Sequence, residues 1–398
     1  MNKKNIAIIG GGASALMLAC FLDANKYNIS LYEKNKALGR KFLVAGKGGF
    51  NLTHSEDLPQ FAERYYPKEF IEPFLNHFSN TDFRNWLKLI GIETYVGTSK
   101  RVFPIKGIKP IEVLQYIEKQ LEKNKASVFC DHTWQGWKND ELIFSNKNEI
   151  KKVKADIVVF ALGGASWKVT GSDGSWTNYF NEKRIETSLF YPSNCAYQIN
   201  WNEAFIKTYH GQTLKNCEFS CGKIKRKGEV VITQFGIEGS GIYPLSPEIR
   251  QQLIQNKAAN IQIDFKPDLL LEEIKNRIDN KGKLSIKDVL EKKINLSPAQ
   301  IELLKLASSK EEYNNIDFLS QLIKNYPLTL VGFAPLDDSI STVGGISLNE
   351  INANLELKKL PNNYCMGEML DWDAPTGGYL LQACFSMGKF LADKLNDL

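Results

Sequence analysis

The pattern of apolar and polar positions predicts a strand, a helix and a second strand within the first 33 residues. Residues 5–9 are mostly small or branched apolar residues, residues 13–24 form an apolar helical run without proline, and residues 29–33 form a second strand. Glycines occupy positions 10–12, between the first strand and the helix. This order is typical of the β-turn-α-β unit that binds dinucleotides.

Each small residue of the turn has a place in such a unit. Gly10 permits the tight turn, Gly12 lets a pyrophosphate approach the backbone, and Ala15 allows the helix to pack closely on the strand. The phosphates would lie on unpaired N–H groups at the helix start, where the helix dipole favours negative charge. Glu33 follows the glycines by about 20 residues and is placed to accept hydrogen bonds from a ribose hydroxyl. The cofactor contacts predicted from this unit are Gly10, Gly12, Ala13, Ser14, Ala15 and Glu33.

The next part of the chain predicts helices and then more strands. Helical spacing of apolar residues covers residues 58–125, and residues 126–130 predict another strand of the sheet. Alternating segments on both sides of Asn139-Asp140 predict a hairpin.

A continuous apolar run over residues 156–161 predicts a parallel strand that is covered on both faces. Ala161, Gly163 and Gly164 lie at its carboxyl end, where ligands bind in open α/β sheets, and we predict that they contact the cofactor. The alternative is a second nucleotide site for NAD(P)H, although no full glycine fingerprint opens a helix there.

The character of the chain changes between residues 190 and 336. Short β-prone segments alternate with polar turns up to residue 266, and helical stretches occupy residues 267–325. The lysine-rich residues 222–228 predict the tip of a hairpin. Its cations either touch phosphates or form an ordinary solvated surface; they are Lys223, Lys225, Arg226 and Lys227.

The last 60 residues return to a glycine-rich pattern. A short strand ends at Gly367 and Glu368, and an apolar helix begins at Tyr379 and runs to about Leu395. Helix N–H groups stabilise negative charge, so the start of this helix suits the end of a cofactor that becomes anionic on reduction. The cofactor contacts predicted here are Gly367, Glu368, Asp373, Gly377, Gly378 and Tyr379.

Together these patterns predict an α/β protein in which the chain leaves one domain and later re-enters it. The fold class is a FAD-binding Rossmann-like domain of the glutathione-reductase type, with an inserted β-barrel plus helical domain. The wide separation of the cofactor-like segments favours FAD over NAD. The resemblance to FAD-binding members of this fold implies a β-meander within residues 126–151. The predicted domains are residues 1–189 and 337–398 for the cofactor and 190–336 for the insertion, with a barrel over 190–266 and helices over 267–325.

Composition adds few constraints. The 398 residues can bury a large core, and 50 basic against 45 acidic residues give a net charge of +5, which permits a nucleic-acid partner without requiring one. Seven cysteines without a C-x-x-C pair, and a first strand that begins at residue 5, predict a reducing, cytoplasmic location. No apolar run has the roughly 18 residues of a membrane span, and the four histidines show no metal-ligand spacing. We expect neither a membrane nor a metal partner.

The loop after the second strand is rich in glycine and cations. Such a loop behind a dinucleotide fold either lies against a phosphorylated ligand or is flexible and solvated. We predict the first of these, with Arg40 or Lys41 near the phosphates. The cofactor contacts predicted in this loop are Lys34, Gly39, Arg40, Lys41, Gly46, Gly48, Gly49 and Asn51.

Several of these motifs resemble one family. The run Gly39-Arg40-Lys41-Phe42-Leu43, the glycine cluster after it, and Asn51-Leu52-Thr53 are similar to the loop that lies beside the flavin in BaiN/YhiN-like (aminoacetone-oxidase-type) FAD-binding flavoproteins. Many members carry Arg-Cys-Asn where this chain has Gly49-Phe50-Asn51, so any role of that cysteine has no thiol here. Residues 100–104 and 233–241 also resemble family motifs, and the resemblance implies that Arg101 anchors an anionic or carbonyl substrate.

The resemblance implies a FAD-dependent oxidoreductase that takes hydride from NAD(P)H, a transient reductant, and reduces a C=C bond next to a carbonyl. Family members are associated with steroid-like enones and with dihydrouridine formation in ribosomal RNA, so the expected partner is a small molecule or ribosomal RNA. The alternatives are an oxidase of a small amine, or a non-catalytic flavin protein that binds RNA or senses redox state. The catalytic candidates are Lys47, Asn51 and Arg101, and the further polar candidates for substrate contact are His54, Glu238, Asp371 and, more weakly, Tyr243.

Overall fold

The structure is a computed structural model that describes residues 2–44, 50–147 and 149–398. The polypeptide divides into two compact units, one made of Met1–Pro192 with Leu336–Leu398 and the other of Ser193–Pro335. The sequence placed the corresponding boundaries after residues 189 and 336. We refer to the two parts as unit 1 and unit 2.

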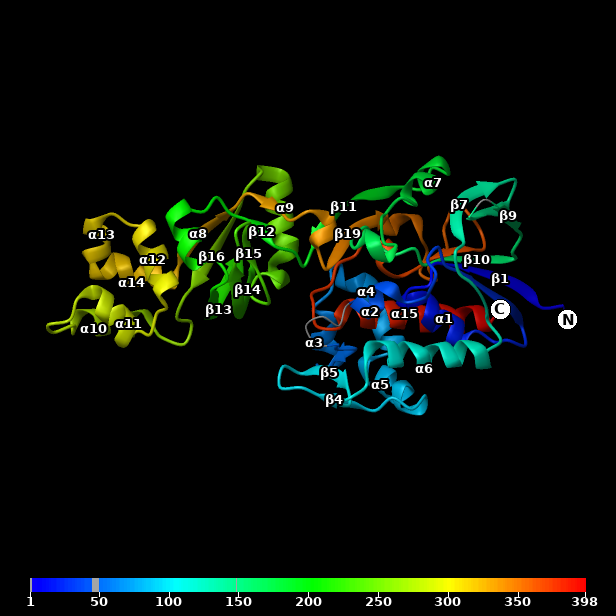
Figure 1. Cartoon of the computed structure of the whole chain (residues 1–398), viewed down its shortest axis with the longest axis horizontal. Coiled ribbons are helices and arrows are strands. Elements are labelled where there is room, and N and C mark those ends of the chain that lie inside the picture. Colours follow the sequence, from blue (N-terminus) through cyan, green and yellow to red (C-terminus); the bar gives the residue numbers. More distant parts are fainter. Residues whose placement is uncertain (1, 45–49, 148) are drawn as a thin grey trace. The chain divides into compact units, whose positions relative to one another are not determined.

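A five-stranded parallel sheet forms the centre of unit 1, with the strand order β20-β10-β1-β2-β6. The sheet therefore joins strands from both ends of the sequence, as predicted. Its strands are β1 (Lys4–Ile9), β2 (Tyr27–Tyr32), β6 (Ser127–Phe129), β10 (Ile157–Phe160) and β20 (Asn363–Cys365). Figure 1 labels two neighbouring strands of this sheet, β1 and β10.

The order of the strands fixes where a ligand can bind. From β1 the chain proceeds to β2 on one side, whereas β10 pairs with the other side of β1. This is a topological switch point, and ligands of open α/β sheets bind outside the carboxyl ends of the strands at such a point. All residues of β10 are buried because both faces of the sheet are covered.

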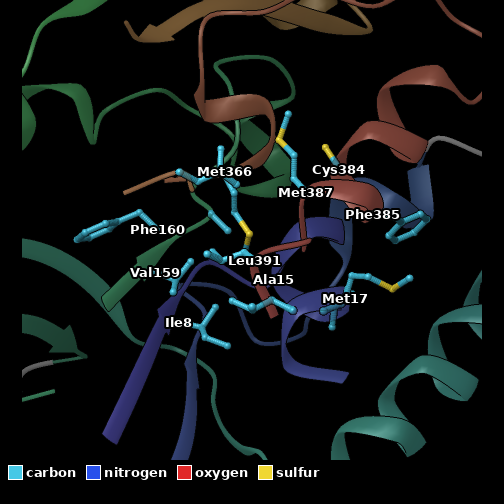
Figure 2. Packing of buried hydrophobic residues seen from close by; sticks show 14 of the residues in the cluster. Ile8, Ala15, Met17, Val159, Phe160, Met366, Cys384, Phe385, Met387 and Leu391 are labelled. Atoms are coloured by element: carbon cyan, nitrogen blue, oxygen red, sulfur yellow. The ribbon is translucent and has the colours of Figure 1, made fainter. Parts of the chain in front are cut away.

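Two helices from opposite ends of the sequence pack together beside this sheet. They are α1 (Ala13–Phe21) and α15 (Tyr379–Asn396). Gly388 of α15 allows the close approach, because a Cβ there would lie 2.5 Å from the backbone oxygen of Ser14. Figure 2 shows the resulting core, with Ile8 on the sheet, Met17 on α1 and Leu391 on α15.

The remaining helices of unit 1 are short except for one. Helix α6, which begins at Pro110, also lies against α1. The helices are α2 (Arg40–Val44), α3 (Leu58–Ala62), α4 (Lys68–His77), α5 (Asn80–Leu89), α6 (Pro110–Lys123) and α7 (Thr177–Glu182), with 3-10 turns at Lys168–Thr170, Leu336–Asp338, Leu348–Glu350 and Gly367–Met369.

Small antiparallel sheets complete unit 1, and two of them correct the sequence expectations. The meander consists of β7 (Thr133–Lys138), β8 (Glu141–Asn146) and β9 (Glu149–Val153), so it begins later than the predicted residue 126. Strand β6 belongs to the parallel sheet, as we expected for residues 126–130. The region expected to be wholly helical contains β4 (Thr94–Val96) and β5 (Arg101–Pro104), which form a sheet with β3 (Thr53–His54) in the order β3-β5-β4. A further pair joins β11 (Thr187–Ser193) and β19 (Ser341–Ile346).

Unit 2 contains a sheet whose two ends are successive parts of one segment. The order is β17-β16-β13-β14-β15-β12-β18, and residues 326–333 pair with β16 at their start and with β12 at their end. The sheet therefore closes on itself as a barrel. Its strands are β12 (Tyr197–Gln198), β13 (Thr213–Cys221), β14 (Ile224–Ile232), β15 (Gly236–Glu238), β16 (Ala259–Asp264), β17 (Tyr326–Leu330) and β18 (Gly332–Phe333).

Unit 2 has its own apolar core, to which both the barrel strands and the helices contribute. The helices are α8 (Glu203–Tyr209), α9 (Ser246–Asn256), α10 (Leu271–Asp279), α11 (Ile286–Lys292), α12 (Pro298–Leu306), α13 (Lys310–Asn314) and α14 (Ile316–Lys324). The predicted hairpin tip at residues 222–228 is shorter than expected. Only Gly222 and Lys223 form the turn, whereas Lys225, Arg226 and Lys227 lie within β14. In the part of the chain that the structure describes, no helix is long and apolar enough to cross a membrane.

Candidate functional site

The turn between β1 and α1 has the form that an anion-binding turn requires. Gly10 has φ of +102°, and a Cβ there would lie 2.3 Å from the backbone oxygen of Ala161, so only glycine fits. Gly12 faces open space, because a Cβ there would meet no atom within 4 Å. Helix α1 begins directly after it without a side-chain cap. The first N–H groups of the helix therefore point to a place that a phosphate can fill.

Glu33 closes the other side of this turn. Its carboxylate accepts hydrogen bonds from the backbone N–H of Gly11 at 2.7 Å and from the backbone N–H of Asn35 at 2.8 Å. The carboxylate is thus held at the carboxyl end of β2, beside the switch point of the sheet. This is the position that the sequence assigned to a ribose-binding acid.

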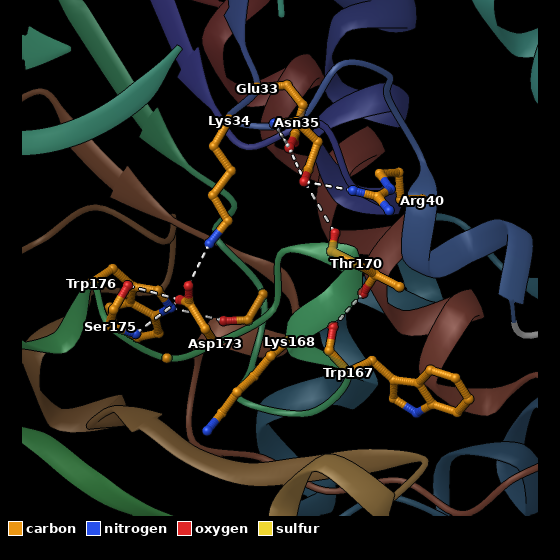
Figure 3. A network of polar contacts seen from close by, with 12 residues as sticks. Glu33, Lys34, Asn35, Arg40, Trp167, Lys168, Thr170, Asp173, Ser175 and Trp176 are labelled. Atoms are coloured by element: carbon orange, nitrogen blue, oxygen red, sulfur yellow. Dashed lines mark hydrogen bonds and ion pairs between the residues drawn. The ribbon is translucent and has the colours of Figure 1, made fainter. Parts of the chain in front are cut away.

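A loop from later in the sequence packs against the residues that follow Glu33 (Figure 3). The side chain of Asn35 donates to the backbone oxygen of Thr170 at 3.1 Å, and the guanidinium of Arg40 donates to the amide oxygen of Asn35 at 2.9 Å. Lys34 forms an ion pair with Asp173 at 2.8 Å. Two predicted cofactor contacts, Lys34 and Arg40, therefore hold polypeptide segments together in this structure.

Lys41 and Glu368 join the two ends of the sequence. The Nζ atom of Lys41 donates to both carboxylate oxygens of Glu368 at 2.9 and 2.8 Å, and to the hydroxyl of Ser166 at 2.9 Å. The backbone N–H of Thr342 also donates to Glu368, at 3.3 Å. Gly164 lies directly beside the pair, because a Cβ there would be 3.1 Å from the Glu368 carboxyl carbon. The structure brings together Lys41, Gly164 and Glu368, which are three of the predicted cofactor contacts.

The start of α15 is a second place where glycine is needed. Gly377 and Gly378 have φ of +113° and +95°, and a Cβ on Gly378 would lie 2.6 Å from the Cα of Thr53. The Nδ2 atom of Asn51 is buried here and has no hydrogen-bond partner among the described residues. The Nε atom of Arg101 lies 3.5 Å from the position of a Gly377 Cβ. An unused amide donor, a guanidinium and a helix N-terminus thus converge.

A buried polar cluster beside this helix start was not predicted from the sequence. Glu56 forms an ion pair with Arg64 and accepts a hydrogen bond from the hydroxyl of Tyr379 at 2.8 Å. The hydroxyl of Tyr65 donates to the backbone oxygen of Tyr379 at 2.7 Å. Burial and the bond to Glu56 raise the pKa of Tyr379. The cluster therefore fixes the first turn of α15 to the chain around residue 60.

His54, a candidate for substrate contact, belongs to the same cluster. Its ring stacks on Tyr379 with centroids 5.1 Å apart. Its Nδ1 atom accepts from the backbone N–H of Glu56 at 3.2 Å, and its Nε2 atom lies 3.2 Å from the backbone oxygen of Ser99. Both ring nitrogens have protein partners, so the imidazole supports the site without facing a substrate.

We expect this cluster to make the protein sensitive to acid. Burial lowers the pKa of His54, so the unfolded chain binds a proton at a higher pH than the folded chain. The stabilisation is therefore complete well above the unfolded histidine pKa of about 6.5 and is lost as the pH falls below it. Thermal unfolding between about pH 8 and 5 should show a falling midpoint, with a shallower slope in His54→Gln. Parallel curves for the two proteins would exclude His54 as the cause.

Two further residues that the sequence suggested, Asp371 and Asp373, form hydrogen bonds within unit 1. Asp371 accepts from the hydroxyl of Ser188 at 2.6 Å and from the backbone N–H of Gly344 at 3.0 Å. The backbone of Asp373 forms an antiparallel bridge with that of Tyr66. These two acids hold loops of unit 1 in place.

Further candidates belong to unit 2 or to the part of the chain that is not described. Glu238 and Tyr243 belong to unit 2, and burial raises the pKa of Tyr243 to about 12. Four predicted residues fall outside the described part of the chain: Gly46, Lys47, Gly48 and Gly49. Within the described ranges, no histidine, cysteine or acidic side chains come together in a group that could hold a metal ion.

Comparison with known proteins assigns this chain to a protein family. Residues 4–394 match the HI0933-like protein Rossmann domain, so the chain belongs to this family. Among solved structures, a flavocytochrome c3 fumarate reductase is similar at a TM-score of 0.51 and 12% identity over 100% of this chain and 78% of that one. A 3-ketosteroid-Δ4-(5α)-dehydrogenase from Rhodococcus jostii is similar at a TM-score of 0.50 and 13% identity over 98% and 96%. The predicted FAD-binding Rossmann fold is confirmed.

Two named relatives are similar to this chain over nearly its whole length. The 3-dehydro-bile acid delta(4,6)-reductase of Clostridium scindens is 23% identical, over 98% of this chain and 97% of its own length. The ribosomal RNA dihydrouridine synthase of Haemophilus influenzae is 22% identical over 96% of each chain. The family recognised from the loop motifs is therefore confirmed.

Proposed function

We propose that this protein is a FAD-dependent reductase that uses NAD(P)H to reduce a C=C bond conjugated to a carbonyl group. One observation carries the proposal: the open turn at Gly12 and the glycine start of α15 belong to two helices that pack together in unit 1. The names of the two relatives support the proposal, because one is a delta(4,6)-reductase and the other a dihydrouridine synthase.

The residues at these two places fit the parts of FAD. The N–H groups from Gly12 onward would hold the pyrophosphate, and the Glu33 carboxylate would hold a ribose. The start of α15 and the unpartnered Nδ2 of Asn51 would serve the flavin ring. When bound, FAD supplies the hydride chemistry, so the protein needs no redox side chain of its own.

The protein must then orient the substrate and place a positive charge beside its carbonyl. Arg101 is suited to this task, because its guanidinium lies at the start of α15 and takes part in no ion pair recorded within the described residues. Negative charge that develops on the carbonyl oxygen during reduction would be stabilised there. Phe50 packs edge-on against Phe42 with centroids 4.9 Å apart, so the position of the family cysteine is apolar here. The proton must come from another group or from water.

Anaerobic mixing of the purified, FAD-loaded protein with NADH or NADPH tests the proposal. We expect one of the two nucleotides to bleach the visible flavin band rapidly, and an enone substrate to restore it without oxygen. A flavin that neither nucleotide nor a small amine reduces would identify a non-catalytic flavin protein. A flavin that a small amine reduces and oxygen reoxidises would identify an oxidase.

A further inference from the structure

The sheet β3-β5-β4 has one face that runs from the start of α15 to an exposed edge. His54 lies opposite Arg101 in the register of β3 and β5, and Phe103 lies opposite Tyr95 in that of β5 and β4. Residues that are opposite each other in antiparallel strands share a face, and so do residues two apart on one strand. His54, Arg101, Phe103 and Tyr95 therefore lie along the same face.

The inner end of this face is the candidate site. His54 stacks on Tyr379, the first residue of α15, and Arg101 lies beside Gly377. The outer end is an aromatic pair, since the rings of Tyr95 and Phe103 are stacked with centroids 5.6 Å apart and 27° between their planes. Tyr95 is 43% exposed although it is a large aromatic residue. An aromatic surface thus continues outward from the proposed catalytic arginine.

The same segment carries positive charge without compensation. Residues 94–109 contain no acid, and their cations are Lys100, Arg101, Lys106 and Lys109. The three lysines are exposed, and none of the four cations forms an ion pair recorded within the described residues. Lys227 of the lysine-rich hairpin differs, because it pairs with Asp268 at 2.6 Å. Exposed cations next to stacked aromatic rings are the combination that single-stranded nucleic acids need.

We propose that this face of β3-β5-β4 binds single-stranded RNA. A base stacks on the pair of Tyr95 and Phe103, the phosphates lie near Lys100 and Lys106, and the neighbouring base reaches Arg101. The inference rests on the proposed function and assigns its substrate class. Paired RNA does not expose base faces for such stacking, and a steroid, even with one carboxylate, has no row of charges for these lysines to neutralise.

Binding of a fluorescein-labelled oligouridylate to the FAD-loaded full chain, followed by fluorescence anisotropy, tests this assignment. Tyr95→Ala should weaken binding about tenfold through the loss of base stacking. Lys100→Gln with Lys106→Gln should lower the slope of log affinity against log salt by about 1.4, as expected for two lost phosphate contacts on a single strand. The matched control is Lys223→Gln with Lys225→Gln, which removes the same charge from β13–β14 and should change neither value.

The flavin spectrum and the melting temperature of each variant show whether it is folded. Binding of a steroid enone is measured with the same variants, because a steroid is the alternative substrate. The proposal is overturned if the wild-type protein does not bind the RNA, or if the control pair weakens binding as much as the β4–β5 variants do. It is also overturned if Tyr95→Ala weakens binding of the enone and not of the RNA. Tyr95-dependent RNA binding by a protein whose flavin NAD(P)H cannot reduce would support the face and reject the reductase function.

Discussion

A methyl group at position 12 should leave the protein folded and weaken FAD binding, whereas a methyl group at position 10 should disrupt the fold itself. Gly12 has φ of −83° and empty space around its Cβ position, so Gly12→Ala should change the unfolding free energy by no more than about 1 kcal/mol. The same space is where a pyrophosphate would approach the backbone. We expect FAD affinity to fall at least about tenfold, which corresponds to about 1.4 kcal/mol.

Gly10→Ala meets two penalties. Its φ of +102° strains any side chain by about 1–3 kcal/mol, and its Cβ would press on the backbone oxygen of Ala161 at the junction of β1 and β10. We expect a loss of more than about 3 kcal/mol. Gly107→Ala is the matched control, because its φ is +101° but no atom lies within 4 Å of its Cβ position.

Urea unfolding of the cofactor-free variants and titration with FAD separate these effects. Gly107→Ala measures the strain alone, and the difference from Gly10→Ala measures the clash. If Gly12→Ala binds FAD as tightly as the wild-type protein does, the turn is not the pyrophosphate site. If Gly10→Ala is as stable as Gly107→Ala, Gly10 does not lie as close to the backbone oxygen of Ala161 as the structure places it.

The central sheet could be predicted because its signals are local. Each of three signals can be recognised within about ten residues of sequence. They are the glycines of the first turn, the apolar run of β10 and the glycine start of α15. The family motif around Arg101 was also visible, and the structure places that arginine beside Gly377. Patterns of this kind depend on backbone geometry, which a short stretch of sequence specifies.

The surroundings of the site could not be predicted, because they depend on contacts between distant residues. Strands β4 and β5 are too short to show alternation, so residues 58–125 were expected to be helical. Glu56 and Tyr379 are far apart in the sequence and come into contact only when the chain folds, and nothing near either residue in the sequence indicates this contact. Asp371 was expected to face a substrate, but its carboxylate is used by Ser188 and a backbone N–H. Sequence patterns identify acids and cations without identifying their partners.

Lys41→Met should destabilise the cofactor-free protein by about 3 kcal/mol, because it leaves the buried carboxylate of Glu368 without its ion-pair partner. The side chain of Glu368 is 9% exposed, so water does not replace the lost ammonium group effectively. Glu368→Gln added to Lys41→Met removes the uncompensated charge and should restore part of the stability. Urea unfolding of the two single variants and the double variant gives the coupling energy.

The same variants decide between two roles for Lys41. The sequence placed this lysine at the cofactor phosphates, whereas the structure pairs it with Glu368 and Ser166. A phosphate role predicts that Lys41→Met weakens FAD binding and leaves the cofactor-free protein as stable as before. Lys34→Met is the control, because the Lys34–Asp173 pair is about one-third exposed and should contribute at most about 1 kcal/mol. If Lys41→Met costs no more than Lys34→Met, the pair does not join the two ends of the sequence, and the phosphate role is the better account.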